Sequence, residues 1–378
     1  MNVDGRWRRT IEVRDPGTVI VLDQAKLPHE VSWLALDDLD ATAHAIREMH
    51  VRGAPLIGAT AAHGVALALR GGRSLDEACT MLAASRPTAI NLRWALDHMR
   101  LRIAEVPADT QVDVADAEAA RICDADVACC EAIGDHGVAL IRAVAERHGG
   151  RPVQVLTHCN AGWLATVDWG TALAPIYKAH EAGIAVHVWV DETRPRNQGL
   201  LTAWELAQHG VPHTVIADNA GGHLMQQGKV DLCLVGTDRT TRNGDVCNKI
   251  GTYLKALAAH DNGVPFYAAV PSSSIDWTVG EPSEIPIEER AGDELRYLAG
   301  RGDRGGTTRI AILAGTTAVG NPAFDVTPRR LMTGLVTERG ITSATAAGLA
   351  ALFPEHAADH AAARDPDAGR PERGKDRR

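Results

Sequence analysis

Five short polar segments follow the five strands predicted in the second half of the chain. The strands are predicted at residues 153–156, 184–190, 213–217, 232–235 and 266–270, and the polar segments at 158–160, 191–195, 218–219, 236–239 and 271–273. Ligands of open α/β sheets bind beyond the carboxyl ends of the parallel strands. The pattern therefore predicts one binding site at that edge of the sheet, where a thiol, carboxylates, amides and cations would meet.

Cys159 is the candidate thiol of this site. It lies in the segment LTHCNAG (156–162), between the end of a predicted strand and a glycine. Helix N-terminal amides and a neighbouring histidine can lower the pKa of a thiol in such a place. The alternative is a buried, inert cysteine, which we expect for Cys79, Cys129 and Cys130 on predicted helices. The position at a strand end favours a functional role for Cys159.

Asp238 is the candidate acid, because it follows the apolar run LCLVG (232–236). Burial at the end of such a strand raises the pKa of a carboxyl group, which can then stay protonated and act as a general acid. Two structural alternatives stay open, namely an N-cap for a helix predicted to begin near Asn248 or an ion pair with Arg239. Asn248 and Lys249 are predicted to open that helix, where amides and a lysine can hold a phosphate.

A second candidate anion site lies in the first half of the chain, at the sequence RGAP that begins with Arg52. Gly53 lets the backbone approach a ligand, and Pro55 is typical of a helix start. Arg52 adds a two-pronged donor that suits phosphate. Arg86 repeats the pattern before the next predicted helix, whereas Arg93 falls between the apolar positions of that helix and is expected on the surface.

The loop 191–199, which contains Gln198, is dense in hydrogen-bonding groups. It can bind sugar hydroxyls, or it can be a salt-bridged surface loop. The histidines form no i, i+4 pair with metal-site geometry and the cysteines show no zinc spacing, so no metal site is predicted. The sequence has no Walker loop and no GxGxxG after a strand, so no nucleotide cofactor is predicted.

Composition excludes several classes of protein. The 378 residues carry 39 basic and 48 acidic side chains, a net charge of −9, which argues against a nucleic-acid-binding surface but not against a local basic pocket. No apolar run reaches the ~18–20 residues of a membrane span, and the first residues show no apolar signal region. The odd number of cysteines, seven, indicates thiols in a reducing compartment. We therefore expect a cytoplasmic protein without membrane or nucleic-acid partners.

The helices and strands that must position these residues follow a pattern that predicts an α/β fold in three parts. Residues 1–150 are expected to form a mainly helical domain with a small antiparallel sheet within residues 10–31. Residues 151–345 alternate strands and helices, which predicts a Rossmann-like, doubly wound parallel sheet. Residues 346–378, rich in Ala, Asp, Arg, Gly and Pro, are predicted to be a disordered tail.

Six segments, in order along the chain, resemble the methylthioribose-1-phosphate isomerases of methionine salvage, which are relatives of the α, β and δ subunits of initiation factor 2B. They are RGAPLIG (52–58), SRPTAINL (85–92), THCNAGWLATVDWGTAL (157–173), DETRPRNQG (191–199), GTDRTTRNGDVCNKIGTY (236–253) and NPAFDVTP (321–328). The resemblance covers residues 10–341. It implies a homodimer that converts the aldose 5-methylthioribose 1-phosphate to the ketose 5-methylthioribulose 1-phosphate without a redox cofactor.

The resemblance also implies roles for nine residues. The catalytic residues would be Cys159 and Asp238, and the substrate-binding residues Arg52, Gly53, Ala54, Arg86, Gln198, Asn248 and Lys249. We expect Asp238 to be the acid or proton relay and Cys159 to lie at C1 and C2 of the sugar. Hydrogen would move from C2 to C1 either as a proton or as a hydride.

One departure from the family and two competing relatives affect this interpretation. Trp163 stands where the family has a small residue, and its closeness to Cys159 in the chain predicts a place near the substrate tail. Archaeal ribose-1,5-bisphosphate isomerases share the cysteine and aspartate but tend to lack the counterparts of Arg239 and Tyr253. The regulatory subunits of initiation factor 2B share the fold but not the chemistry, and the intact catalytic set argues against that class.

Overall fold

The computed structural model describes residues 1–356 except residues 4, 88, 304 and 305. The α-helices are α1 (Leu39–Arg47), α2 (Ala54–Arg70), α3 (Leu75–Ser85), α4 (Ile90–Ala104), α5 (Gln111–Arg147), α6 (Ala174–Glu181), α7 (Gln198–Gln208), α8 (Ala220–Gln226), α9 (Thr252–Asp261), α10 (Asp293–Arg296) and α11 (Ala346–Leu352). The strands are β1 (Asn2–Val3), β2 (Arg6–Trp7), β3 (Ile11–Asp15), β4 (Thr18–Leu22), β5 (Trp33–Leu36), β6 (Val153–Thr157), β7 (Val186–Asp191), β8 (His213–Ile216), β9 (Leu232–Val235), β10 (Arg239–Thr241), β11 (Val246–Lys249), β12 (Phe266–Ala269), β13 (Ile275–Asp276), β14 (Tyr297–Arg301), β15 (Thr307–Ala311), β16 (Phe324–Thr327), β17 (Gly334–Thr337) and β18 (Gly340–Thr342).

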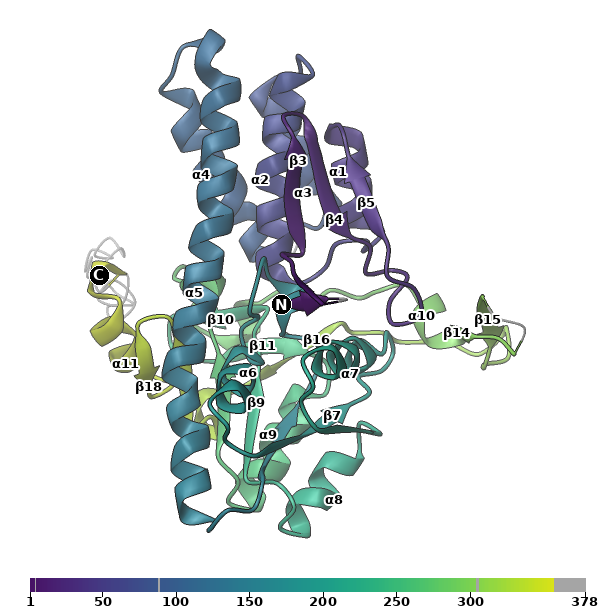
Figure 1. Ribbon diagram of the computed structural model, residues 1–378, viewed down its shortest axis with the longest axis vertical. Helices are drawn as coiled ribbons and strands as arrows, with labels where there is room; N and C mark the ends of the chain where they lie inside the picture. The colour runs from purple at the N-terminus through teal and green to yellow at the C-terminus, as the bar shows by residue number, and fades with distance from the viewer. Residues whose placement is uncertain (4, 88, 304–305, 357–378) are drawn as a thin grey trace, which may run out of the picture.

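The N-terminal part is mainly helical, as predicted. Strands β3 and β4 form the predicted small antiparallel sheet beside α1 and α2, and β5, which lies outside the predicted range, adds a third strand. Every residue of α2 from 56 to 68 is buried, because α2 lies among α1, α3, α4 and α5 (Figure 1). A Cβ at Gly58 would come within 2.8 Å of the Asn91 carbonyl oxygen, so the glycine lets α4 approach closely.

Helix α5 runs along the whole molecule and joins its two parts (Figure 1). Its first half packs against α2 and α4, and its second half against α6 and β17. Gly137 of α5 faces Pro175, and a Cβ there would lie only 2.4 Å from the proline ring. Neither α5 nor any other helix in the described part of the chain has the length and apolar character of a membrane span.

The second part is built on a seven-stranded sheet with the order β18-β17-β12-β9-β6-β7-β8. All neighbours are parallel except β17 and β18, which pair antiparallel. The five predicted strands and the predicted doubly wound α/β fold are confirmed. Strands β17 and β18 were not predicted. Gly334 and the short apolar run after it carry too weak a local signal, and pairing with the distant β12 makes them strands.

A second, four-stranded sheet with the order β13-β10-β11-β16 lies beside the first. It corrects the prediction that Asn248 and Lys249 open a helix, because both residues belong to strand β11 and helix α9 begins at Thr252. Strands β10 and β11 form a hairpin around Asn243-Gly244, and Gly244 has φ of +94°. An Asn-Gly pair between short strands is a strong hairpin signal, so this turn could have been found in the sequence.

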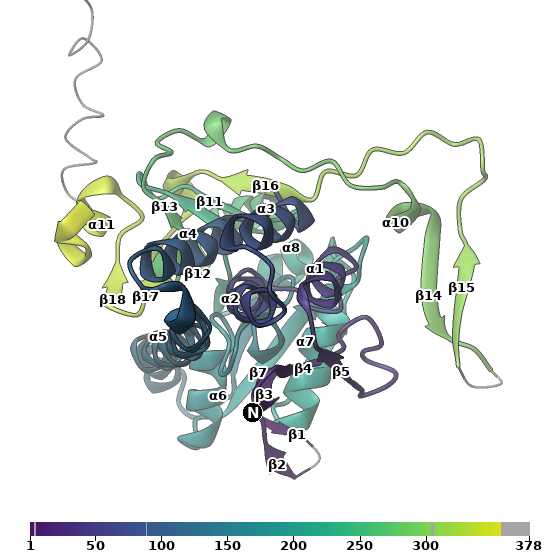
Figure 2. The ribbon, with the colours of Figure 1, turned by 90° about the horizontal axis from the view of Figure 1, so that it is seen from above.

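A hairpin of β14 and β15 extends away from the rest of the molecule as an arm (Figure 2). All five residues of β15 are exposed, and Ile310, Ile312 and Leu313 are large apolar side chains exposed on or next to it. Two segments connect the arm to the molecule, and they pair with each other at Glu289 and Pro322.

The prediction of a disordered tail from residue 346 is wrong for its first part. Residues 346–352 form helix α11, whose N-terminus is capped by Thr345. Leu349 and Phe353 are fully buried, and this burial of apolar side chains against the second part of the molecule stabilises the helix. The rest of the predicted tail, residues 357–378, lies outside the described residues.

Candidate active site

One pocket brings all nine predicted site residues together. It lies between the helical N-terminal part and the carboxyl edge of the seven-stranded sheet. Its lining includes Arg52, Gly53, Ala54 and Arg86 from the N-terminal part, and Cys159, Gln198, Asp238, Asn248 and Lys249 from the second part. The sheet edge predicted from the polar segments is therefore the location of the pocket.

Gly53 lets the start of α2 approach Ala165 closely at the pocket. It is the N-cap of α2 and has φ of +92°, a conformation that favours glycine. A Cβ at this position would lie 2.3 Å from the Cα of Ala165, so a larger residue would push α2 away from the loop after β6. Because a glycine N-cap has no side chain, no N-cap side chain occupies the first amides of α2.

Arg52 is held in place by Asn160. Its Nη1 donates to Oδ1 of Asn160 at 2.8 Å, and Asn160 Nδ2 in turn donates to Glu205 and, at 3.1 Å, to Thr202 Oγ1. Glu205 is fully buried and also accepts from the Tyr177 hydroxyl at 3.0 Å. Burial raises the pKa of Glu205 to about 7. The guanidinium of Arg52 therefore reaches the pocket with its orientation set by a buried hydrogen-bond chain.

Cys159 has a left-handed backbone with φ of +67°. Two threonines hold this conformation: the Cys159 amide donates to Thr193 Oγ1 at 2.9 Å, and Thr202 Oγ1 donates to the Cys159 carbonyl at 2.8 Å. Burial raises the pKa of the Cys159 thiol above its ordinary value, although the charges of Lys249 and Arg52 oppose the rise. The expectation of a lowered thiol pKa is therefore wrong.

His158 does not serve Cys159 as a base. Its Nδ1 lies 3.1 Å from Asp191 Oδ2 and its Nε2 lies 2.9 Å from the Ile250 carbonyl oxygen. Both ring nitrogens thus face oxygen acceptors, and the ring ties the loop after β6 to the segment before α9.

Asp238 is a partly exposed carboxyl group beside several cations. Burial raises its pKa, as predicted, while the charges of Lys249, Arg86 and Arg52 oppose the rise. Asp238 does not cap the helix after it, because Asp325 caps α9 by accepting from the amides of Gly251 (2.7 Å) and Tyr253 (3.0 Å). This capping also removes the predicted use of the α9 amides as a phosphate site.

Lys249 points its ammonium group into the pocket from β11 and is 8% exposed. Its Nζ lies 4.5 Å from the centre of the Phe324 ring on the neighbouring strand β16. Burial lowers the pKa of Lys249, and the negative charges that Cys159 and Asp238 carry when ionised oppose the fall. The residue reaches the predicted site from a strand, not from a helix N-terminus.

Arg86 and Gln198 each present a buried polar atom without a hydrogen-bond partner in the described structure. These atoms are Arg86 Nε and Gln198 Oε1. Arg86 lies 3.9 Å from Glu288, its closest ion-pair contact among the described residues. Buried polar groups without partners are costly in a folded protein. Because both side chains line the pocket, a bound ligand with an anionic and a hydroxyl group would satisfy them.

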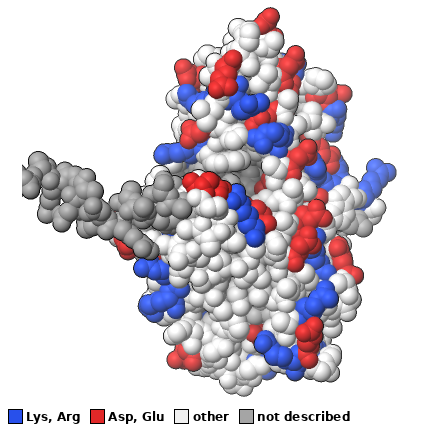
Figure 3. Space-filling model, turned by 90° about the vertical axis from the view of Figure 1, so that its left-hand side faces the viewer, with Lys and Arg blue, Asp and Glu red and all other residues white. Residues whose placement is uncertain are grey.

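The structure adds cations to those predicted to bind phosphate. Arg196 and Arg290 line the same pocket, and so does Arg239, which pairs with Asp276 at 3.2 Å. Among the described lining residues the charged side chains are therefore six cations and the single carboxylate of Asp238. On the face shown in Figure 3, by contrast, basic and acidic side chains are intermixed around a broad area of other residues. The positive charge of the pocket is local and suits a small anion.

Two further predictions concern residues near the site. Arg93 is exposed on the outer side of α4, as expected. Trp163 is fully buried in the hydrophobic core, where its Nε1 donates to the Arg8 carbonyl at 3.1 Å. Its ring points into the core, so the expectation that it meets the substrate tail is wrong. Closeness along the chain does not fix the direction of a side chain.

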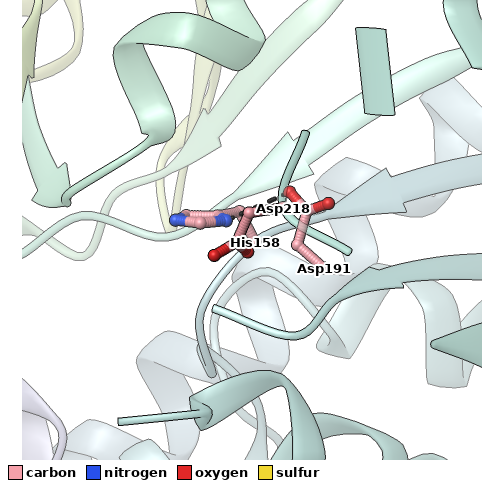
Figure 4. A group of neighbouring side chains, drawn as sticks. All are labelled: His158, Asp191 and Asp218. Atoms are coloured by element: carbon pink, nitrogen blue, oxygen red, sulfur yellow. Dashed lines mark hydrogen bonds and ion pairs between the residues drawn. The ribbon is translucent and has the colours of Figure 1, made fainter. Parts of the chain in front are cut away.

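His158, Asp191 and Asp218 lie close enough to form a candidate metal site (Figure 4). Most of their donor atoms are already engaged, and the exception is Asp191 Oδ1, which is buried without a hydrogen-bond partner among the described residues. Both oxygens of Asp218 accept backbone amides, from Thr193 and Arg194 at 2.8 Å each, and Asp191 Oδ2 lies 3.2 Å from the ammonium group of Lys255. The group fits a buried ionic support of the loops after β6 and β7 better than a metal centre.

Comparisons with known proteins identify relatives of nearly the whole chain. The initiation factor 2 subunit family matches residues 50–344. A methylthioribose-1-phosphate isomerase from Rhodospirillum rubrum is 60% identical, covering 94% of this chain and 94% of that protein. One from Methylobacterium nodulans is 61% identical, covering 94% of this chain and 99% of the relative.

Solved structures extend the comparison to the fold. The crystal structure of 5-methylthioribose 1-phosphate isomerase from Pyrococcus horikoshii OT3 has a TM-score of 0.79 and 37% identity, covering 93% of this chain and 97% of that one. The crystal structure of the translation initiation factor eIF-2B, subunit delta, from A. fulgidus has a TM-score of 0.76 and 34% identity. The match covers 92% of this chain and 100% of that one. The chain therefore belongs to the initiation factor 2 subunit family and, within it, to the methylthioribose-1-phosphate isomerases.

Proposed function

We propose that this protein is an aldose–ketose isomerase that converts 5-methylthioribose 1-phosphate to 5-methylthioribulose 1-phosphate. The observation that carries the proposal is the pocket itself, in which Cys159 and Asp238 lie among six cations. Relatives that are 57–61% identical over nearly the whole chain have this activity in their names. The same comparison favours this function over the ribose-1,5-bisphosphate and regulatory-subunit alternatives.

The lining matches the two ends of such a substrate. Arg52, Arg86 and Lys249 provide charge-assisted donors for the phosphate. Apolar side chains, among them Met49 and Ile57, provide contacts for a methylthio group. The unpartnered Gln198 Oε1 can accept a hydrogen bond from a sugar hydroxyl.

Asp238 is the proposed proton carrier. Burial raises its pKa, which favours the protonated form that can donate to the ring oxygen as the bond between C1 and that oxygen breaks. The phosphate on C1 prevents simple opening to a free aldehyde, so this protonation is the step that needs help. The ionised carboxylate can then accept the proton of the C2 hydroxyl as C2 becomes a ketone. The reaction is a redox-neutral isomerisation and consumes no redox cofactor.

Cys159 is the proposed group beside C1 and C2. Burial keeps its thiol protonated, so it offers a weakly polar contact rather than a ready base. This favours movement of hydrogen from C2 to C1 as a hydride rather than as a proton. Conversion in heavy water separates the two routes: deuterium at C1 of the product would support the proton route.

The direct test is turnover of purified protein with 5-methylthioribose 1-phosphate, followed by NMR detection of the ketose. Ribose 1,5-bisphosphate serves as the competing substrate in a parallel assay. We expect a kcat/KM at least about a hundredfold higher for the methylthio sugar, because burial of the apolar tail favours it. Preference for the bisphosphate, or no turnover of either sugar, would reject the proposal.

We also propose that the protein is a homodimer and that the arm contacts the second copy. A two-stranded hairpin is marginally stable in water without a packing partner, and β15 exposes Ile310 and the neighbouring Ile312. Sedimentation analysis of the wild type and of the Ile310→Asp/Ile312→Asp variant tests this. A monomeric wild type, or a variant that dimerises as tightly as the wild type, would contradict the proposal.

The seven free cysteines support a cytoplasmic location.

A further inference from the structure

Residues 281–296, here called the strap, run beside the pocket on the way to the arm. Ile285, Pro286 and Arg290 of the strap line the pocket. Backbone hydrogen bonds tie the strap to the segment that returns from the arm: the Arg290 amide donates to the Asn321 carbonyl and the Ala323 amide to the Glu288 carbonyl, each at 2.9 Å. The strap therefore holds Arg290 at a defined position beside the predicted phosphate residues.

Arg290 is bound by two carboxylates of its own segment. Its Nη1 donates to Glu288 at 2.7 Å, while its Nη2 and Nε donate to Glu294 at 2.7 and 2.8 Å. Glu294 also accepts from Arg196 and Asn321, at 3.0 Å each. Glu294 thus has three donor residues and fixes one edge of the guanidinium.

Glu288 occupies a different environment. Besides Arg290 it faces Arg86, at the longer distance of 3.9 Å. Arg86 is the residue whose buried Nε has no hydrogen-bond partner among the described residues. A carboxylate between two pocket arginines, one of them incompletely bonded, occupies the kind of place in which a phosphate would bind.

We propose that Glu288 is an internal stand-in for the phosphate of the substrate, and that Arg290 joins Arg86 as a phosphate ligand when the phosphate displaces Glu288. The proposal rests on the sugar-phosphate substrate proposed above and adds a binding residue from the strap. A phosphate dianion carries more charge than a carboxylate and presents three oxygens, so it can satisfy both guanidinium groups at once. Glu294 would keep Arg290 in place during the exchange.

The stand-in role has an unusual consequence, because removing Glu288 should improve phosphate binding. The variant Glu288→Gln removes the competing charge without removing a phosphate ligand. We expect inorganic phosphate to bind this variant about three- to tenfold more tightly, and Arg290→Gln about tenfold more weakly, than the wild type. Isothermal titration calorimetry with inorganic phosphate measures both, independently of turnover.

Matched controls come from the arm side of the strap. Asp293 and Arg309 form an exposed ion pair at 2.9 Å, so Asp293→Asn and Arg309→Gln change the charge equally without touching Arg86 or Arg290. Both should bind phosphate as the wild type does. Should Glu288→Gln fail to fold, Glu288→Ala serves the same purpose.

The outcomes separate this inference from the proposed function. If Glu288→Gln binds phosphate as weakly as the wild type or more weakly, the stand-in role is wrong, since a merely structural carboxylate would give that result. If Arg290→Gln binds like the wild type, Arg290 is not a phosphate ligand. If the variants behave as expected but the wild type does not isomerise the methylthio sugar, the proposed function fails and the anion site stands.

Discussion

The guanidinium of Arg52 donates a 2.8 Å hydrogen bond to the side-chain carbonyl of Asn160, the residue directly after Cys159. Arg52 lies at the start of α2 and Asn160 follows β6, so this bond joins the two halves of the pocket. Glu205 and Thr202 on α7 accept the two hydrogens of the Asn160 amide. Movement of any of these elements would therefore displace both the Cys159 thiol and the proposed phosphate ligand Arg52.

Loss of Arg52 should weaken substrate binding and slow turnover. A charge-assisted hydrogen bond is worth about 1.5–3 kcal/mol, so Arg52→Ala should raise KM for the phosphorylated sugar roughly ten- to a hundredfold. It should also lower kcat, because binding energy from the phosphate helps to assemble the site. Steady-state kinetics measure both constants, and Arg93→Ala, on the exposed side of α4, is the matched control. A larger effect of Arg93→Ala would reject the assignment.

Asn160 should act as a positioning residue for Arg52. Asn160→Ala leaves the guanidinium in the chain but removes its hydrogen-bond partner, so KM should rise while the reacting carboxyl and thiol groups stay in place. Addition of Arg52→Ala to this variant should cost less than it does in the wild type, since coupled residues are not additive. Full additivity in this double-mutant cycle would show that the two side chains act independently.

Asp238 should make turnover depend on pH. An acid must be protonated to donate, so kcat should fall as the pH rises through the pKa of Asp238, which burial has raised. Asp238→Asn should lose about 10²–10⁴ in kcat and keep its melting temperature, because the amide has nearly the same shape. The kcat–pH profile and the melting curve check this. A variant within a few-fold of the wild-type rate would rule out the acid role.

Cys159 should be slow to react with alkylating agents in spite of its place in the pocket. The thiolate is the reactive form, and the raised pKa of Cys159 leaves little of it at neutral pH. Mass spectrometry after iodoacetamide treatment measures the rate of alkylation at this residue.

Cys159→Ser should lower kcat with little change in melting temperature. Retained activity together with a large loss of stability would instead show that Cys159 is structural.

His63 should make stability fall at acid pH. Burial in α2 lowers the pKa of this histidine to about 4, below its ordinary value of 6.5. Between these values the unfolded chain binds a proton that the folded protein does not, so the unfolding free energy falls as the pH drops through that window. The loss amounts to roughly 3 kcal/mol. Denaturant unfolding from pH 7.5 to 4 should show a smaller slope for His63→Gln, but an unchanged slope for the exposed His29→Gln.

Dialysis against a chelator should leave activity and melting temperature unchanged. The donors of His158 and Asp218 are engaged by protein groups, and Lys255 contacts Asp191 where a cation would approach. Assays before and after dialysis, with divalent ions added back, check this. Activity that is lost and then restored by a metal would overturn the interpretation of the cluster as an ionic support.

The amino-acid sequence by itself determined the architecture and the location of the site. Strand and helix periodicities are local properties, and alternating apolar strands and amphipathic helices have few solutions other than a doubly wound sheet. The same reasoning located Cys159 and Asp238, because polar residues after buried strands must gather at one edge.

Only the tertiary structure decided which further residues line the candidate site and how its side chains are oriented. The direction of Trp163, the capping of α9 by Asp325 and the approach of Arg290 depend on segments that are far apart in the chain. The hairpin around Asn243-Gly244 carried a local signal, but the pairing of β11 with β16 made Lys249 a strand residue. The pKa of the Cys159 thiol also depends on the tertiary structure. Burial of Cys159 outweighs the nearby charges, and the extent of that burial is set only when the whole chain has folded around the residue.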